Sequence, residues 1–191
     1  MSDMAEVFQA LEAIGTFEGY PTVLLLCTSE YPTLPENVNL LKLETLKNSF
    51  PDLIVGFSDH TQGTLASSLA VSFGAVFFEK HFTLDNDLEG PDHWFSENPI
   101  GLGNWTTAIH NSFKMMGSRV IRPSKGESEN KKEFQRVVVA KKDINLGDIF
   151  GLDNLTVSRV SGGKGFPPSF LKRILGLKSN KIYSKNEAIT I

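Results

Sequence analysis

The sequence contains almost no cysteine and no long apolar segment. Cys27 is the only cysteine among 191 residues, so the chain cannot form an internal disulfide or a metal site built on several thiolates. No apolar run approaches the ~18 residues that a membrane-spanning helix needs. The N-terminal residues also lack the basic start and apolar stretch of a signal peptide. Together these absences predict a protein of the reducing cytoplasm.

Charge is distributed unevenly along the chain, although the net charge is only −3. Residues 1–121 contain five Lys and Arg against fifteen Asp and Glu, a net −10, and residues 122–191 contain fourteen against seven, a net +7. A basic region can indicate nucleic-acid binding. Here the basic residues alternate with apolar residues and glycine turns, without interleaved aromatic residues. We therefore expect a folded domain that docks on an acidic surface or closes over an anionic substrate, with no nucleic-acid or membrane partner.

The region before residue 117 alternates between predicted strands and helices. Strands are predicted at 23–27, 53–58 and 75–82, and helices from Pro35 to near Phe50, at 63–73 and at about 104–116. This alternation predicts an α/β fold with parallel, adjacent strands. A doubly wound sheet and part of an eight-stranded barrel both fit. The apolar strands, each ending in polar residues at its carboxyl edge, favour the barrel.

Two histidines lie near the ends of the second and third predicted strands. Side chains alternate between the faces of a strand, so Ser58 shares a face with His60, and Glu79 shares a face with His81. Two imidazoles at the carboxyl ends of neighbouring strands can hold a divalent metal and leave positions open for substrate and water. From spacing alone, two such histidines are more often hydrogen-bonded core or surface groups without a metal. Lys80 has the opposite parity and is expected to point outward.

The composition changes after residue 117. Residues 118–133 are rich in serine, glycine and charged side chains, which predicts a linker. Residues 134–191 predict a small β-rich domain with glycine turns and one short helix. Its size of ~60 residues is below that at which domains usually fold unaided with ease.

Several short segments resemble the sialic acid synthases, a family that joins phosphoenolpyruvate to an N-acylated amino sugar. They are Cys27-Thr28-Ser29-Glu30-Tyr31-Pro32, Gly56-Phe57-Ser58-Asp59-His60-Thr61, Phe78-Glu79-Lys80-His81-Phe82-Thr83-Leu84-Asp85 and Gly90-Pro91-Asp92-His93. The tail resembles the family's antifreeze-like (SAF) domain through Ala140-Lys141-Lys142-Asp143-Ile144, Asp153-Asn154-Leu155-Thr156-Val157 and Ile174-Leu175-Gly176. The resemblance implies the last three βα units of a (β/α)8 TIM barrel at 1–117, a linker at 118–133 and a β-clip SAF domain at 134–191.

The resemblance also implies roles for individual residues. His60 and His81 match the pair that holds Mn²⁺ or Mg²⁺ in this family. Glu79 matches an acid close to the metal. Substrate-binding positions near the phosphoenolpyruvate and the sugar are matched by Ser29, Tyr31 and Ser58.

Arg159 matches an arginine that, in this family, reaches from the SAF domain of one subunit into the barrel of its dimer partner. The resemblance therefore implies a catalytic contribution from Arg159 and a domain-swapped homodimer. The family usually continues with Pro-Gly after this arginine, whereas Val160-Ser161-Gly162 follows here. The loop that presents Arg159 is therefore expected to differ in shape.

Two hypotheses of different class follow from these observations. The first is a metal-dependent synthase that condenses phosphoenolpyruvate with N-acetylmannosamine or a relative into a nonulosonic acid and releases phosphate, with this chain as its C-terminal part. The second is a truncated or split-gene, non-catalytic chain that supplies a metal site and an SAF arm to a partner polypeptide. The second arises because Met1 falls within a predicted helix just ahead of the first predicted strand. The family's early strands also carry the lysines that bind phosphoenolpyruvate, and nothing in this sequence replaces them.

Overall fold

The computed structural model describes residues 1–160, 162 and 164–190 and divides into two compact units. The N-terminal unit comprises Met1–Ser118 and the C-terminal unit comprises Arg119–Ile191. Among the described residues, no helix combines the length and apolarity required to cross a membrane.

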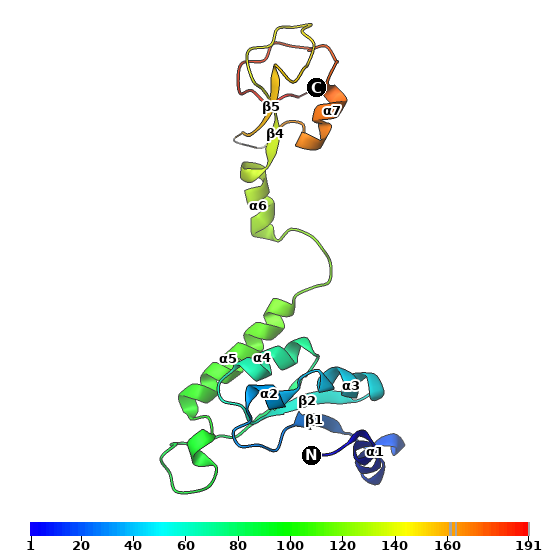
Figure 1. Ribbon diagram of the computed structural model, residues 1–191, viewed down its shortest axis with the longest axis vertical. Helices are drawn as coiled ribbons and strands as arrows, with labels where there is room; N and C mark the ends of the chain where they lie inside the picture. Colours follow the sequence, from blue (N-terminus) through cyan, green and yellow to red (C-terminus); the bar gives the residue numbers. More distant parts are fainter. Residues whose placement is uncertain (161, 163, 191) are drawn as a thin grey trace. The chain divides into compact units, whose positions relative to one another are not determined.

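A three-stranded parallel sheet forms the centre of the N-terminal unit (Figure 1). Its strands lie in the order β1 (Val23–Cys27), β2 (Ile54–Asp59) and β3 (Phe77–Lys80). The helices of this unit are α1 (Met4–Ala13), α2 (Pro35–Val38), α3 (Lys42–Ser49), α4 (Leu65–Ser72) and α5 (Pro99–Met116), with short 3-10 turns at Thr16–Glu18 and His93–Phe95. The parallel pairing of adjacent strands confirms the prediction from the alternating pattern.

Helices α3, α4 and α5 pack against one face of this sheet. Their core contains Leu26, Val55 and Phe57 from the strands together with Leu43 of α3 and Ala70 of α4. Helix α5 lies beside α4 (Figure 1) and packs on it through buried Trp105 and Ile109. We call this the helix face of the sheet.

Alternate strand residues point to the opposite face, which we call the open face. Three apolar side chains on it are well exposed: Val23 at 39%, Ile54 at 51% and Phe77 at 50%. Gly56 lies between Leu25 and Phe77 in the strand register. A Cβ at this position would overlap the Phe77 carbonyl oxygen and the Leu25 side chain, so glycine permits the close approach.

Two helices differ from the sequence prediction for local reasons. The region after Pro35, predicted as one helix, breaks into α2 and α3 because Asn39 adopts a left-handed conformation with φ of 50°. Helix α5 begins earlier than about residue 104. The Asn98 side chain accepts a 2.9 Å hydrogen bond from the Gly101 amide, and Pro99 occupies the first turn, where its fixed φ suits a helix start.

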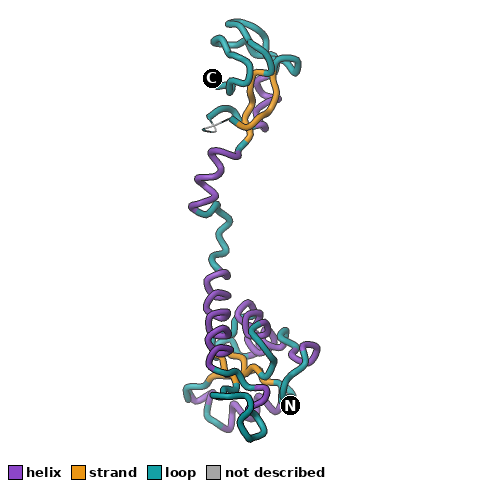
Figure 2. The backbone as a smooth tube through the Cα atoms, turned by 90° about the vertical axis from the view of Figure 1, so that its left-hand side faces the viewer, coloured by secondary structure: helices purple, strands orange, loops and turns teal. Residues whose placement is uncertain are grey.

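The C-terminal unit contains α6 (Lys125–Phe134), β4 (Arg136–Ala140), β5 (Leu155–Arg159), a 3-10 turn at Pro168–Phe170 and α7 (Leu171–Ile174). Strands β4 and β5 pair in an antiparallel arrangement, and Figure 2 shows that loops form most of the remainder after α6. These loops enclose a fully buried core that includes Val138, Ile144, Tyr183 and Ile189. Helix α6 lies within the segment predicted as a linker, where Ser124 and Glu127 form a capping box.

Candidate functional site

Four rings gather beyond the ends of β2 and β3. The centroids of the His60 and His81 rings lie 5.0 Å apart, with their planes at 72°. The Tyr31 ring lies 4.4 Å from His60 and 5.6 Å from His81. The Phe95 ring lies 5.0 Å from His81 and 5.7 Å from Tyr31 between centroids. The strand ends therefore bring together both predicted histidines and the predicted tyrosine.

A backbone carbonyl determines which nitrogen of His60 carries the proton. His60 Nδ1 lies 2.7 Å from the carbonyl oxygen of Thr28, just beyond the end of β1. Because a carbonyl only accepts, Nδ1 must carry the hydrogen, and in the neutral ring Nε2 then holds the lone pair. Metal-binding histidines commonly have this second-shell arrangement. The His60 side chain is also buried, with only 7% of the residue exposed.

A carboxylate that is not among the predicted site residues lies beside His81. Asp92 Oδ2 is 3.8 Å from His81 Nδ1, and the His81 side chain remains 31% exposed. Asp92 belongs to the Gly90–His93 segment that contributed to the family resemblance, so a signal for it was present in the sequence. Phe95 carries no such signal, because its position depends on the path of the loop after β3.

Ser58 and Glu79 form a hydrogen-bonded pair on the open face, one row before the histidines. They are register partners in β2 and β3, and the Ser58 hydroxyl donates to Glu79 Oε1 at 2.7 Å. Ser58 is buried and Glu79 is exposed. The face sharing predicted from strand parity therefore places an oriented carboxylate on the same face as the two histidines, one row earlier.

Lys80 leaves the open face, as its parity predicts, but it does not reach solvent. Its side chain is only 3% exposed, and Nζ lies 3.3 Å from Asp59 Oδ2 on the helix face. The prediction that Lys80 points outward is thus right for the face and wrong if it is taken to mean exposure. The physical reason is the buried Asp59 carboxylate, which compensates the ammonium charge.

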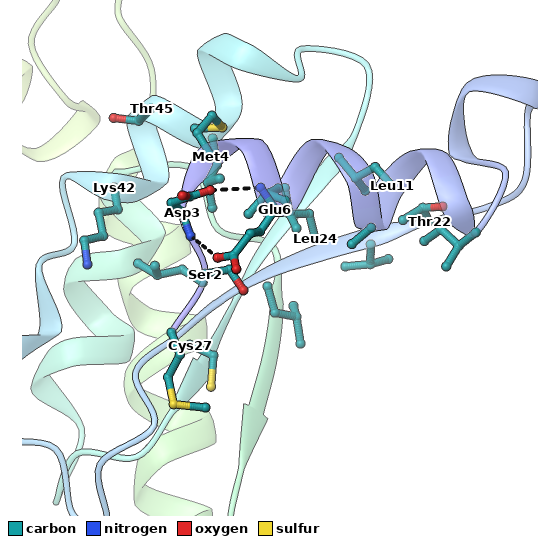
Figure 3. A pocket seen from close by; sticks show the side chains of 18 of the residues that line it. Ser2, Asp3, Met4, Glu6, Leu11, Thr22, Leu24, Cys27, Lys42 and Thr45 are labelled. Atoms are coloured by element: carbon teal, nitrogen blue, oxygen red, sulfur yellow. Dashed lines mark hydrogen bonds between the residues drawn. The ribbon is translucent and has the colours of Figure 1, made fainter.

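Ser29 lies in the lining of a separate pocket beside β1. Figure 3 shows this pocket, with Leu24 and Cys27 of β1 labelled. This pocket of about 550 Å³ is formed mainly by α1, β1 and α3 and is largely apolar, with Leu11, Leu24 and Cys27 in its wall. Neither His60 nor His81 lines it. This pocket is therefore distinct from the ring cluster.

Arg159 ends β5 in the C-terminal unit and is exposed. Its guanidinium carbon lies 5.6 Å from the centroid of the Phe134 ring, at the end of α6. Of the loop that follows, Ser161 lies outside the described residues. The predicted reach of Arg159 into a partner subunit stays a prediction.

The donor chemistry of the two imidazoles fits a divalent cation. His60 offers an unprotonated Nε2, and His81 is its close neighbour. Among residues 1–160, 162 and 164–190, no group of three or more His, Cys, Asp or Glu side chains is arranged to hold a metal. A cation at this position would therefore depend on oxygen atoms from water or substrate for the rest of its ligands.

Residues 1–121 match the family model described as the NeuB family, and residues 135–191 match the SAF domain. The chain belongs to the NeuB family. This match confirms the resemblance to the sialic acid synthases, and it confirms an α/β region combined with an SAF domain. The placement of the strands within a barrel is a finer statement that the match leaves as a prediction.

Curated proteins are similar to this sequence over nearly its full length. The chain is 38% identical over 191 residues to the N,N'-diacetyllegionaminic acid synthase of Campylobacter jejuni, covering 99% of this NeuB-family chain and 56% of that protein. It is 34% identical to the N-acetylneuraminate-9-phosphate synthase of Homo sapiens, covering 93% of this chain and 48% of the human protein. The chain thus spans about half the length of the curated relatives it matches.

A solved structure of a named synthetase has a similar fold. The N-acetylneuraminic acid (sialic acid) synthetase of Leptospira borgpetersenii is 32% identical and superposes with a TM-score of 0.60. The superposition covers 68% of this chain and 45% of that one. The fold similarity therefore agrees with the family assignment made from sequence.

Proposed function

We propose that this NeuB-family chain forms the C-terminal part of a synthase that condenses phosphoenolpyruvate with an N-acylated amino sugar. The product is a nonulosonic acid, and inorganic phosphate is released. We further propose that β1, β2 and β3 are consecutive strands of an eight-stranded β/α barrel. The placement of α3, α4 and α5 on one face only supports this, because a doubly wound sheet has helices on both faces.

The observation that carries the proposal is the His60–His81 pair at the carboxyl ends of adjacent parallel strands. The ring centroids are 5.0 Å apart, and His60 Nδ1 donates to a backbone carbonyl so that Nε2 is available. We assign His60 and His81 as the protein ligands of Mn²⁺ or Mg²⁺. Such a cation, when bound, supplies Lewis-acid polarisation of a substrate carbonyl oxygen.

Other residues of the site prepare the reacting groups. Ser58 holds Oε1 of Glu79 through a 2.7 Å hydrogen bond, and we assign the second oxygen, Oε2, to accepting a proton from the water that attacks during the reaction. Tyr31 presents a half-exposed ring against His60, suited to packing on the apolar face of a sugar. We assign Tyr31 and Ser58 as substrate contacts near the two histidines. The assignment of Ser29 as a third contact rests on the family resemblance, because Ser29 lines the separate pocket beside β1.

We propose that Arg159 completes the site from the partner subunit of a domain-swapped homodimer. Its guanidinium has a fixed fork of donors, which suits carboxylate and carbonyl groups of the anionic substrate. The relatives named as synthases support an enzyme over a non-catalytic chain that only lends its parts to another polypeptide.

The first test is Mn²⁺ binding, measured by calorimetry with His60→Gln and His81→Gln variants. Each variant removes a proposed ligand and should weaken the affinity by more than about tenfold, since loss of a second-shell partner alone costs 10–100-fold. His110→Gln is the matched control, because His110 is exposed on α5. Unchanged affinity in both site variants would remove the metal assignment.

The second test is turnover. The synthase that contains this chain as its C-terminal part is mixed with Mn²⁺, phosphoenolpyruvate and N-acetylmannosamine or a related N-acylated amino sugar, and phosphate release is followed. Release should require both substrates and should fall in Glu79→Gln, because the amide cannot accept the proton. Phosphate release at an equal rate without any sugar would contradict the condensation reaction.

A further inference from the structure

A buried charged network lies directly behind the ring cluster, on the helix face of the sheet. Asp59 and Lys80 are register partners in β2 and β3, and each immediately precedes one of the two histidines. Asp59 is fully buried, the Lys80 side chain is 3% exposed, and Lys80 Nζ lies 3.3 Å from Asp59 Oδ2. The reaction proposed above does not use either residue.

Both oxygen atoms of the Asp59 carboxylate accept hydrogen bonds. Its Oδ1 accepts from the Thr61 amide at 2.8 Å and from the Thr61 hydroxyl at 2.7 Å. Its Oδ2 accepts from the Ser67 hydroxyl of α4 at 2.6 Å and lies 3.4 Å from Trp105 Nε1 of α5. Two helices and the chain on both sides of His60 therefore converge on one carboxylate.

Lys80 extends the same network towards His81. Its ammonium donates to the Thr61 carbonyl oxygen and lies 3.9 Å from Glu97 Oε1. The Glu97 amide in turn donates to the His81 carbonyl at 3.0 Å. Lys80 therefore connects the backbone that follows His60 with the segment that pairs with the backbone of His81.

Stability alone explains this arrangement poorly. Desolvating two charges can cost as much as their attraction returns, and an apolar pair of similar volume is often equally stable. What the pair does provide is directional restraint, because its bonds hold the residues flanking both histidines. The imidazoles project from the same backbone to the opposite face.

We propose that Asp59 and Lys80 are positioning residues that set the spacing and orientation of His60 and His81 for a shared cation. This inference rests on the proposed function for its purpose. The physical effect it describes, restraint of the two rings, is measurable without any metal. The positioning role of Asp59 and Lys80 and the proposed function can therefore be disproved separately.

The experiment compares the full chain with Lys80→Met and with the double variant Asp59→Leu/Lys80→Met. The double variant removes both charges together and leaves no unpaired buried ion, so it is designed to fold even if Lys80→Met does not. Lys142→Met is the matched control, because it makes the same change in an exposed pair with Asp153. Thermal unfolding and circular dichroism establish which variants are folded.

Two measurements then report on the rings. In the metal-free protein, long-range imidazole ¹⁵N NMR should show the Nδ1–H tautomer of His60 in the wild type and a mixture of tautomers in the folded Lys80 variants. By calorimetry, Mn²⁺ affinity should fall by about 10–100-fold in these variants, as for other second-shell losses. Lys142→Met should match the wild type in both measurements.

A folded double variant with the wild-type tautomer and wild-type Mn²⁺ affinity would overturn the proposal, since the network would then be purely structural.

If neither variant folds, the Glu97→Gln variant decides between the two outcomes. It changes the more exposed end of the network, where the Glu97 side chain is 16% exposed, and should weaken Mn²⁺ binding measurably. Unchanged affinity and tautomer in Glu97→Gln would then overturn the proposal. A wild type with the predicted tautomer but no Mn²⁺ binding would contradict the proposed function and leave the restraint intact.

Discussion

On the helix face of the sheet, side chains are either apolar and buried or engaged in the Asp59–Lys80 network. On the open face, the same strands present exposed Val23, Ile54 and Phe77 together with the polar groups of the candidate site. Because side chains alternate, Ser58, His60, Glu79 and His81 each follow directly on a residue that points to the helix face: Phe57, Asp59, Phe78 and Lys80. The comparison teaches that the residues that stabilise the fold and the residues of the candidate site lie on opposite faces of one sheet.

The largest expected contrast between the faces comes from two phenylalanines. Phe57→Ala removes a ring that is 2% exposed on the helix face and should cost about 3–5 kcal/mol of unfolding free energy. Phe77→Ala removes a ring that is 50% exposed on the open face and should cost about 1 kcal/mol, since less apolar area leaves water on folding. Denaturant unfolding of both variants measures this. Equal losses would mean that the open face is covered in solution.

Gly56→Ala tests whether the open face can be filled. The added Cβ would overlap the Phe77 carbonyl oxygen and the Leu25 side chain, and a shift of the strands should cost about 1–3 kcal/mol. Gly103→Ala in α5 is the control, because no atom lies within 4 Å of its added Cβ. That change should stabilise the helix by up to about 1 kcal/mol. A Gly56 variant as stable as wild type would show that the strands can separate at this row.

The smallest contrast concerns two serines whose hydroxyls donate to carboxylates. Ser67→Ala on the helix face removes the buried 2.6 Å bond to Asp59 and the 2.9 Å bond that Ser67 Oγ accepts from Trp105 Nε1, and should cost about 1–3 kcal/mol. Ser58→Ala frees the exposed Glu79, which water can solvate, and should cost about 0.5 kcal/mol while lowering turnover. Chemical unfolding and phosphate release measure the two effects. The reverse ranking of stability would contradict the assignment of the faces.

Much of the N-terminal sheet could be predicted from the sequence because period-2 alternation and apolar runs are local signals. The strand at 23–27 was predicted with the limits that the structure shows, and the sharing of a face by Glu79 and His81 follows from parity alone. Helix α6 could not be predicted from apolar periodicity, because its described side chains are exposed and its signal lies in the Ser124–Glu127 capping box.

The contributions of loops and of the helix face were harder to predict. Asp92 and Phe95 reach His81 through a loop whose path depends on bonds such as that between Thr83 and His93. The burial of Lys80 required knowing that Asp59 lies opposite it in register, a tertiary fact that a single strand does not reveal. Site residues within strands were therefore accessible from sequence, and those brought in by tertiary contacts were not.

The contact between His60 and the Thr28 carbonyl has a consequence for mutational tolerance. Every residue type presents the same oxygen to the ring, so position 28 can change its side chain freely as far as this contact is concerned. An insertion that rotates the peptide plane there would instead switch the imidazole to its other tautomer. Substitutions at position 28 should therefore leave this hydrogen bond in place. Insertions or deletions in the same loop should break it and abolish metal binding.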